Sequence, residues 1–597
     1  MDGRPGTLAE FTEWTAERYG PEPALRFRAP DGGAPRTRTY AELAATVRRC
    51  GRALLGLGVA AGERVAVLGE TRPEWTYTHF GVLTAGAVLV PVYPTAGEEE
   101  LAWVLSDSAA VVAVCGDEAL AARVEALRGK LPELRAVVAM DDLVADAVGP
   151  AGGPRGARAG DAELAARAAS VTPDADAAIV YTSGTTGLPK GCRLTHGNLG
   201  AIQDATLPLI RGGPGDSTYL YLPLAHLLAQ LIQFTTLLEG GELSYFGGRV
   251  EDVVAELAQA RPTHLPSVPR LFEKVHAVVR ALAEGQGEDG ARRFDEAVRL
   301  GVLAADGKLP EESRAAWEAA ELSLYSLVRG AFGGRVKWAL TGGAPIAPAT
   351  LDFLRACGIP VFEGYGMTES GGVISLNHPG AARPGTVGRP IDGCEVRIAP
   401  DGEVLARGPM VFPGYHGDPA ATAEALDAGG WLHTGDLGAL DEEGYLSLTG
   451  RKKELIITSA GKNITPTEVE FAVQAASRFV SRAVLIGDRR PHPVALITLD
   501  AEETAAWAAR ESLDLGPRPG EHPAVRALVA EAVAAANATV SRPAGIRAFR
   551  ILDEEFSVAA GTLTPTLKLR RRAVADRYAS EIDALYAAGA PRDAATT

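Results

Sequence analysis

Cysteine is scarce in this sequence: five are spread over 597 residues. Their number is odd, none forms a CxxC pair, and no cluster of cysteine and histidine has the spacing of a zinc site. A disulfide framework and a structural zinc site are therefore not expected. We expect a reduced, intracellular protein that uses its cysteines as small apolar side chains.

Long hydrophobic runs and an excess of basic charge are also missing. The longest apolar stretch, residues 82–93, is interrupted by Pro91, whereas a membrane helix needs about 20 apolar residues. The N-terminus lacks the basic and apolar segments of a signal peptide. The formal net charge of −16 argues against binding to nucleic acid, which requires basic patches. We expect a cytoplasmic protein whose only membrane contact would be peripheral.

The N-terminal part alternates between two kinds of pattern. Short β-branched runs at residues 64–69, 88–92 and 110–115 predict strands, and the segments near 74–86 and 97–107 predict helices. This alternation favours an α/β layer with a largely parallel sheet. A chain of 597 residues is also long enough for two to four domains, at roughly 100–200 residues per domain.

Changes in composition indicate where the chain divides. Residues 145–175 are rich in Ala, Gly, Pro and Arg and predict a linker. Residues of about 283–330 are charged, rich in alanine and helical in period, which predicts a helical insert outside the core. A boundary is predicted after residue 450, giving an N-terminal domain of residues 1–450 and a small α+β domain of residues 451–597.

One glycine-rich segment has the composition of a phosphate-binding loop. Residues 181–191 read YTSGTTGLPKG and follow an apolar run that predicts a strand. Glycines let backbone amides point at an anion, hydroxyls add donors, and Lys190 supplies a positive charge. The Gly-Lys-Ser/Thr ending of a Walker A loop is absent, which disfavours a P-loop ATPase. The alternative interpretation is a polar turn between two elements.

Further short segments occur along the chain, and their combination in this order is much more specific than any one of them. They are TYAEL (39–43), AGAVLVPV (85–92), TGGAP (341–345), EGYGMTES (363–370), GEV (402–404), PGY (413–415), WLHTGD (431–436), GRKKE (450–454) and LTPTLKL (563–569). With the glycine-rich loop, they resemble the adenylate-forming superfamily of acyl-CoA synthetases, peptide-synthetase adenylation domains and luciferase-like enzymes. The resemblance covers about residues 10–575, and the Thr-Pro-Thr-Leu-Lys ending is similar to the long-chain fatty acyl-CoA synthetase branch.

This resemblance implies a fold of the α/β class. A large N-terminal AMP-binding domain would have mostly parallel sheets flanked by helices plus a β-barrel-like subdomain. A small, mobile α+β C-terminal domain would carry the catalytic lysine, Lys568, and would rotate about a hinge at Lys453.

The resemblance also implies residue roles. Lys568, Glu369, Thr185 and Lys190 are the catalytic candidates, and Glu369 is suited to Mg²⁺ because magnesium prefers hard oxygen ligands. The candidate ATP- and AMP-binding residues are Thr182, Ser183, Gly184, Thr185, Thr186, Gly187, Lys190, Gly343, Ala344, Pro345, Glu363, Gly364, Tyr365, Gly366, Met367, Thr368, Asp436 and Arg451.

Two further positions are assigned to the acyl and CoA side. His226 lies among apolar residues, so it is either a core histidine or the side chain that borders the carboxylate end of the acyl pocket. Gly461 resembles part of the segment that lines the pantetheine path after domain rotation.

The expected function is an ATP-dependent ligase that joins a medium- or long-chain fatty acid to CoA through an acyl-adenylate, with Mg²⁺. One alternative is a fatty acyl-AMP ligase that transfers the acyl group to a carrier protein. Another is a catalytically inactive nucleotide-binding protein. Against it argues the joint presence of the functional candidates Lys190, Glu369, Asp436, Arg451 and Lys568. Acyl chain length, oligomeric state and pathway are not specified by these motifs.

Overall fold

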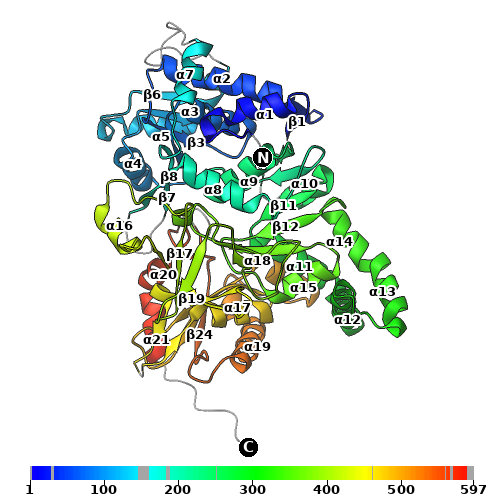
Figure 1. Ribbon diagram of the computed structural model, residues 1–597. Helices are drawn as coiled ribbons and strands as arrows, with labels where there is room; N and C mark the ends of the chain where they lie inside the picture. The colour runs from blue at the N-terminus through cyan, green and yellow to red at the C-terminus, as the bar shows by residue number, and fades with distance from the viewer. Residues whose placement is uncertain are drawn as a thin grey trace, which may run out of the picture.

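The computed structural model describes residues 3–28, 33–145, 160–182, 188–249, 252–459, 461–557, 560–564 and 569–587. Two large sheets form the N-terminal part, and a small domain lies at the opposite end of the molecule (Figure 1). The fold is α/β with mixed sheets and a small C-terminal domain, as expected.

The first sheet has six strands in the order β6-β5-β3-β4-β7-β8. The strands are β3 (Arg64–Leu68), β4 (Val88–Val92), β5 (Val112–Cys115), β6 (Ala136–Ala139), β7 (Asp176–Thr182) and β8 (Lys190–Thr195). All neighbours pair in parallel except β7 and β8, which form an antiparallel pair. The central strands are buried on both faces, which explains their continuous runs of Val, Ala and Leu.

The second sheet has nine strands in the order β15-β14-β13-β12-β11-β9-β10-β1-β2. The strands are β1 (Pro23–Phe27), β2 (Arg36–Thr39), β9 (Ser217–Leu220), β10 (Glu242–Tyr245), β11 (His264–Ser267), β12 (Trp338–Thr341), β13 (Val361–Tyr365), β14 (Ser375–Leu376) and β15 (Arg389–Pro390). Its centre is parallel, whereas β2, β14 and β15 pair antiparallel at the edges. The N-terminal hairpin thus joins the sheet through β10.

Helices cover these sheets. They are α1 (Phe11–Tyr19), α2 (Tyr40–Gly56), α3 (Pro73–Thr84), α4 (Glu98–Asp107), α5 (Glu118–Ala126), α6 (Met140–Val144), α7 (Asp161–Ala169), α8 (His196–Thr206), α9 (Leu227–Leu238), α10 (Val253–Ala260) and α15 (Pro348–Ala356). A capping box between Thr39 and Glu42 begins α2. The predicted linker of residues 145–175 is wrong in part: α7 lies inside it, because Leu164 and Ala168 bury one face of a helix.

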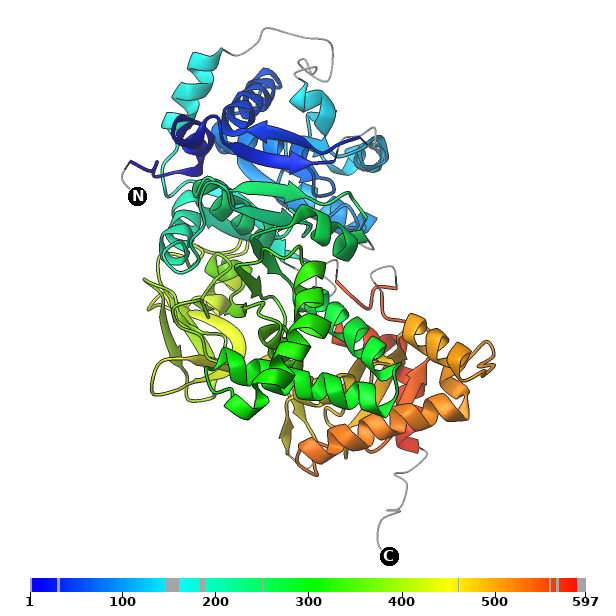
Figure 2. The same ribbon diagram turned by 90° about the vertical axis from the view of Figure 1, so that its right-hand side faces the viewer.

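The predicted insert near 283–330 is helical. It contains the end of α11 (Pro269–Glu284), α12 (Glu288–Ala305), α13 (Arg314–Ala320), the π-helical turn η6 (Glu321–Tyr325) and α14 (Ser326–Ala331). These helices, drawn in green, extend from the right-hand side of the molecule in Figure 1 and face the viewer in Figure 2. They share a core with α15 through residues such as Phe294, Tyr325 and Phe353.

A four-stranded antiparallel sheet occupies the place of the expected barrel-like subdomain. Its strands are β16 (Glu395–Ile398), β17 (Glu403–Arg407), β18 (Leu432–Leu440) and β19 (Leu446–Arg451). Helix α16 (Pro419–Ala425) lies between β17 and β18 in the sequence.

The C-terminal domain has its own core. It contains β20 (Ile456–Ile457), β21 (Asn463–Ile464), β22 (Val480–Ile486), β23 (Val494–Leu499), β24 (Phe549–Leu552), α17 (Pro466–Ala476), α18 (Ala501–Arg510), α19 (Pro523–Thr539), α20 (Arg571–Arg577) and α21 (Ala579–Ala587). Buried side chains of α17 and α19 pack on the three-stranded sheet.

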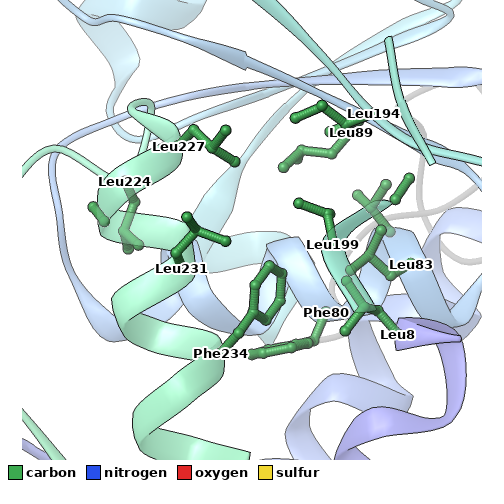
Figure 3. Close-up of a cluster of buried hydrophobic side chains, with 14 of the residues drawn as sticks. Leu8, Phe80, Leu83, Leu89, Leu194, Leu199, Leu224, Leu227, Leu231 and Phe234 are labelled. Carbon is green, nitrogen blue, oxygen red and sulfur yellow. The ribbon is translucent and has the colours of Figure 1, made fainter. Parts of the chain in front are cut away.

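The largest core lies between the two N-terminal sheets. Side chains of α3, α8 and α9 meet there, among them Phe80, Leu199 and Phe234 (Figure 3). All five cysteines lie within the described residues, where they are buried and form no disulfide. Among the helices of the described ranges, none is long and apolar enough to cross a lipid bilayer.

Candidate active site

The glycine-rich loop is held at both ends by an antiparallel pair of strands. Thr182 ends β7 and lies opposite Lys190, which begins β8. Helix α4 fixes the returning end, because the Trp103 indole N–H donates a hydrogen bond of 2.9 Å to the Pro189 carbonyl. The expected phosphate-binding residues Ser183, Gly184, Thr185, Thr186 and Gly187 lie outside the described residues.

Lys190, Tyr415 and Glu369 form one cluster beside this loop. The exposed Lys190 Nζ lies 5.3 Å from the centre of the Tyr415 ring. The Tyr415 hydroxyl donates a hydrogen bond of 2.7 Å to Glu369 Oε1. Burial, followed by the charge of Glu369, raises the pKa of Tyr415 above its ordinary value, so the phenol stays a donor at neutral pH. The cluster thus brings one cation next to one anion.

Two local structures position these side chains. Glu369 lies in the short turn η7 (Thr368–Ser370), which follows β13, and it is only 7% exposed. Tyr415 belongs to the Pro-Gly-Tyr segment, which pairs with β8 through an isolated bridge to Cys192. The Pro-Gly-Tyr segment was among the motifs of the sequence, but no local pattern assigned a role to Tyr415.

A second cluster lies near the N-terminal end of the segment of residues 363–370, whose C-terminal end carries Glu369. The Tyr365 hydroxyl donates a 2.7 Å hydrogen bond to Asp436 Oδ2, and Arg451 Nε lies 3.0 Å from Asp436 Oδ1. Asp436 and Arg451 face each other across β18 and β19, so the sheet register sets their pairing. Burial, followed by the charge of Asp436, raises the pKa of Tyr365.

The segments of residues 341–345 and 363–366 run side by side. Thr341 and Glu363 are paired at the carboxyl ends of β12 and β13, where parallel α/β sheets commonly bind ligands. Gly343 has φ +79°, a conformation that favours glycine, and it precedes Ala344 and Pro345. Burial raises the pKa of Glu363 to about 7.

Close backbone packing fixes the motif between the two clusters. Gly364 follows Glu363 in β13, and a Cβ on Gly366 would lie 2.3 Å from the Gly372 carbonyl oxygen. Met367 and Thr368 lead into η7, where the Met367 amide donates a 3.0 Å hydrogen bond to Ser370 Oγ.

Apolar side chains of α9 reach the end of this motif. A Cβ on Gly372 would lie 2.5 Å from Leu231 Cδ1 and 3.4 Å from Leu227 Cδ2. Both leucines belong to the apolar cluster of Figure 3, where they extend from α9 toward Leu89 and Leu199. His226 is the N-cap of α9, and its Nδ1 accepts a hydrogen bond of 3.2 Å from the Leu228 amide. His226 therefore has a structural role as a helix cap. Its assignment to the acyl side of the site stays a prediction.

Among the described residues, charged side chains of the C-terminal domain lie near the N-terminal part at several places. One is Arg482 of β22, near Glu273 of α11. Two others involve α4 and the end of α11. Arg570 lies near Glu100 in α4, where burial raises the pKa of Glu100 and the charge of Arg570 offsets part of that rise. Lys568 itself lies outside the described residues. At the other place, Arg478 Nη1 lies 3.0 Å from Glu284 Oε2 at the end of α11.

The remaining two candidates lie in the C-terminal half. Lys453 is in the short turn η8 (Lys452–Glu454), directly after β19. Gly461 is exposed, with φ +74°, and its amide donates a 2.8 Å hydrogen bond to the Thr458 carbonyl. The structure therefore places Gly461 in a tight turn and does not bring it into either cluster.

The donor set suits magnesium bound together with a polyphosphate. The described part of the chain contains no group of three or more His, Cys, Asp or Glu side chains that could hold a metal alone. Mg²⁺ commonly takes one or two carboxylates and obtains its remaining ligands from phosphates and water. Glu369, beside Lys190 and the phosphate-type loop, fits that role.

Comparison with known proteins gave consistent matches. The model of the AMP-binding enzyme family matches residues 12–416, and that of the AMP-binding enzyme C-terminal domain matches residues 453–590. Long-chain-fatty-acid–CoA ligase FadD15 of Mycobacterium tuberculosis is 39% identical over 565 residues, covering 92% of both chains. Long chain acyl-CoA synthetase 7 of Arabidopsis thaliana is 32% identical over 621 residues, covering 98% of this chain and 86% of that one.

Solved structures agree in fold. The adenylation domain of a carboxylate reductase from Mycobacterium chelonae superposes with a TM-score of 0.75 at 22% identity, covering 98% of this chain and 92% of that one. The anthranilate CoA ligase AuaEII, in complex with anthranoyl-AMP, gives a TM-score of 0.71 at 21% identity, with coverages of 97% and 98%. At these identities, the likeness shows the fold alone.

Proposed function

Because the chain belongs to the AMP-binding enzyme family, we propose that it is an ATP-dependent ligase that joins long-chain, or medium-chain, fatty acids to CoA. One observation carries this proposal. The segment of residues 363–370 has a cation–carboxylate cluster at the Glu369 end and a pair of buried Asp436 with half-exposed Arg451 at the Tyr365 end; the apolar face of α9 lies against Gly372, just after the Glu369 end. This order suits phosphate, ribose and acyl chain, respectively.

In the first half-reaction, the fatty carboxylate attacks the α-phosphorus of ATP and pyrophosphate leaves, giving an acyl-adenylate. A carboxylic acid with a pKa of about 4–5 is already ionised at neutral pH, so the step needs no general base. The difficulty is the repulsion between two anions. Lys190 offsets it, together with the hydroxyls and amides of the glycine-rich loop. Mg²⁺ held by Glu369 would neutralise further phosphate charge.

The nucleoside is held by the second cluster. Asp436 accepts hydrogen bonds from the ribose hydroxyls, while Arg451, with its Nε 3.0 Å from Asp436 Oδ1, orients the carboxylate. The ring of Tyr365 and the segment of residues 343–345 border the adenine. These contacts are the same in ATP and AMP, so they hold the adenylate between the two half-reactions.

In the second half-reaction, the thiol of CoA attacks the acyl carbon, a thioester forms and AMP leaves. A thiol with a pKa of about 8.5 is partly ionised at pH 7. We assign to Lys568, on the sequence evidence, a role in the first step only. Rotation of the C-terminal domain about Lys453 would then remove Lys568 and bring the segment at Gly461 to the pantetheine path.

The acyl chain is assigned to the apolar region next to Gly372. Leu227 and Leu231 pack against Gly372, and further aromatic and aliphatic side chains of the same buried cluster lie behind them (Figure 3). Burying methylene groups there would stabilise the complex by about 0.8 kcal/mol each, which favours longer chains. His226 lies at the start of α9, on the side of the reacting carboxylate.

The direct test measures pyrophosphate, AMP and acyl-CoA formed from ATP with fatty acids of increasing length, acetate and benzoate, each with and without CoA. We expect CoA-dependent turnover that peaks on long or medium chains. Pyrophosphate release that stops near one turnover and ignores CoA would instead indicate an acyl-AMP ligase that requires a carrier protein. Binding of ATP without turnover on any acid would indicate an inactive nucleotide-binding protein.

A further inference from the structure

One buried carboxylate lies between the nucleotide cluster and the domain boundary. Glu403 begins β17, and its side chain is 6% exposed. Its Oε1 accepts a 2.9 Å hydrogen bond from the Gly435 amide. Its Oε2 accepts a 3.1 Å hydrogen bond from Lys452 Nζ and lies 3.2 Å from His433 Nδ1. A single side chain thus contacts the segment before Asp436 and the segment before Lys453.

On the nucleotide side, β17 fixes both residues that precede Asp436. Gly435 has φ +71°, which favours glycine, and its amide is held by Glu403. The Thr434 hydroxyl donates a 2.7 Å hydrogen bond to the Val404 carbonyl and accepts one of 3.1 Å from the Asp436 amide. The position of the Asp436 carboxylate therefore depends on Glu403.

On the hinge side, Lys452 is held by two carboxylates. Its Nζ lies 3.1 Å from Glu403 Oε2 and 2.6 Å from Asp401 Oδ2. Burial works to raise the pKa of Glu403, but hydrogen bonds from His433, Lys452 and Gly435 outweigh it, and the pKa is lowered. Glu403 and Lys452 therefore form a charged pair at neutral pH.

We propose that Glu403 is a positioning residue that holds Lys452 on the N-terminal domain, so that domain rotation begins at Lys453 and leaves the contact of Arg451 with Asp436 intact. The inference rests on the proposed function, because the rotation belongs to it. Without this anchor, the conformational change would spread to Lys452 and Arg451. The ribose contact would then loosen during rotation, and the acyl-adenylate would escape before CoA attacks it.

This role differs from simple stabilisation in what it predicts. A residue that only stabilises the fold would lower pyrophosphate and acyl-CoA formation together. A residue that anchors the hinge would uncouple them, because adenylate formed in the first step is lost before the second. The ratio of pyrophosphate to acyl-CoA formed is therefore the informative readout.

The test compares Glu403→Gln, Lys452→Met and the double variant with Glu395→Gln as the matched control. Glutamine retains an acceptor for the Gly435 amide but loses the charge that binds Lys452. Glu395 is also on the antiparallel sheet, where it pairs with Arg407 at an exposed position. We expect each single variant to raise the pyrophosphate-to-acyl-CoA ratio about fivefold to tenfold, with no further rise in the double variant. In the control variant, the pyrophosphate-to-acyl-CoA ratio divided by that of the wild type should stay near one.

A second readout does not need turnover. Residues 451–453 are already exposed, so release of Lys452 should loosen their backbone, and trypsin should cut the bond after Lys453 about tenfold faster in both single variants than in the control. AMP affinity, measured by calorimetry, should fall about tenfold in Glu403→Gln. These measurements remain informative if the protein proves inactive on every acid, so failure of the proposed function and failure of the anchor are distinguishable.

The anchor would be overturned by equal ratios and equal cleavage rates in Lys452→Met and the control. It would also be overturned if pyrophosphate and acyl-CoA fell in parallel in every variant. If Glu403→Gln does not fold, Lys452→Met decides the matter, because Lys452 is about half exposed and its loss leaves the Glu403 contact with Gly435 in place.

Discussion

The Tyr415 hydroxyl donates a 2.7 Å hydrogen bond to the Glu369 carboxylate, and the face of the same ring lies 5.3 Å from the Lys190 ammonium. A phenol thus joins the candidate metal ligand to the candidate phosphate-binding lysine. It satisfies one carboxylate oxygen and attracts the cation through the ring electrons. The orientation of both charged groups therefore depends on an uncharged side chain from a distant segment.

Removing only the hydroxyl should impair the magnesium-dependent step. In Tyr415→Phe, Glu369 loses a hydrogen bond while Lys190 keeps its aromatic neighbour, so we expect about a tenfold loss in pyrophosphate formation and a higher Mg²⁺ requirement. Tyr415→Ala should lose more, since the cation–π contact disappears too. Pyrophosphate–ATP exchange at varied Mg²⁺ measures both effects. An unchanged Mg²⁺ dependence in Tyr415→Phe would contradict the assignment.

Neutralising Asp436 should weaken nucleotide binding without affecting the acyl side. Asp436→Asn removes the charge that Arg451 faces at 3.0 Å, and AMP affinity should fall about 10- to 100-fold. The apparent KM for the fatty acid should change little at saturating ATP. Calorimetric titration with AMP and steady-state kinetics provide the two numbers, and an unaltered AMP affinity would rule out the ribose assignment.

Lys568 should separate the two half-reactions. Lys568→Ala is expected to reduce adenylate formation by about 100-fold or more, because a charge aimed at the transition state is lost. Thioester formation from supplied acyl-adenylate and CoA should remain within a few-fold of the wild type. Rapid-quench measurements of each half-reaction test this, and equal losses in both would refute a role confined to the first step.

The ion pair between Arg478 and Glu284 should favour the arrangement of domains described here. Its atoms are 3.0 Å apart across the boundary, with both side chains partly exposed. Glu284→Gln should slow adenylate formation about twofold to fivefold at low salt, and the effect should vanish at high salt because exposed pairs are screened. Asp295→Asn is the control: Arg280 pairs with both Asp295 and Glu284, so this variant removes one of its two carboxylate partners without touching Arg478. A similar, salt-dependent slowing in the control would contradict this role.

Glu363 should make the stability of the N-terminal domain depend on pH. Burial raises the pKa of Glu363 from 4.5 to about 7, so the folded protein keeps a proton that the unfolded chain has released. Stability should therefore fall as pH rises from 4.5 to 7 and then level off, by up to about 3 kcal/mol from this group.

Glu363→Gln should remove that part of the slope. Denaturation midpoints of both proteins at pH 5 and pH 8 give the difference. Glu239, whose pKa burial also raises to about 7, is present in both proteins and cancels in the comparison. Parallel pH profiles for the two proteins would show that Glu363 is ionised when folded.

Much of the fold was predictable because local patterns dominate it. The strand at residues 88–92 and the helices near residues 74–86 and 97–107 have the periodicity that their burial imposes, and the structure confirms them. Helix α7 was missed because its flanks are rich in glycine and proline, while two buried side chains, Leu164 and Ala168, determine its packing. A tertiary contact outweighed the local composition there.

The candidate site was predictable only in part. The sequence motifs indicated Lys190, Glu369 and Asp436 as site residues, because their chemistry suits binding of phosphate, a metal ion and ribose, respectively. Tyr415 and Glu403 were not assigned, since each acts through a contact 30 or more positions away along the chain, and no local pattern encodes such a contact. Sheet register and loop packing create these relationships after folding.

The strand order of the nine-stranded sheet has a consequence for biosynthesis. Leu25 of β1 pairs with Leu243 of β10, about 220 residues later in the chain. At roughly 5–20 residues per second, a ribosome needs about 10–45 s to translate that interval. All six strands of the other sheet are synthesised within it. During this interval the edge of β1 that later pairs with β10 remains unpaired, while the other sheet can already fold. A chain released before residue 245 would keep that edge exposed and would be prone to aggregation.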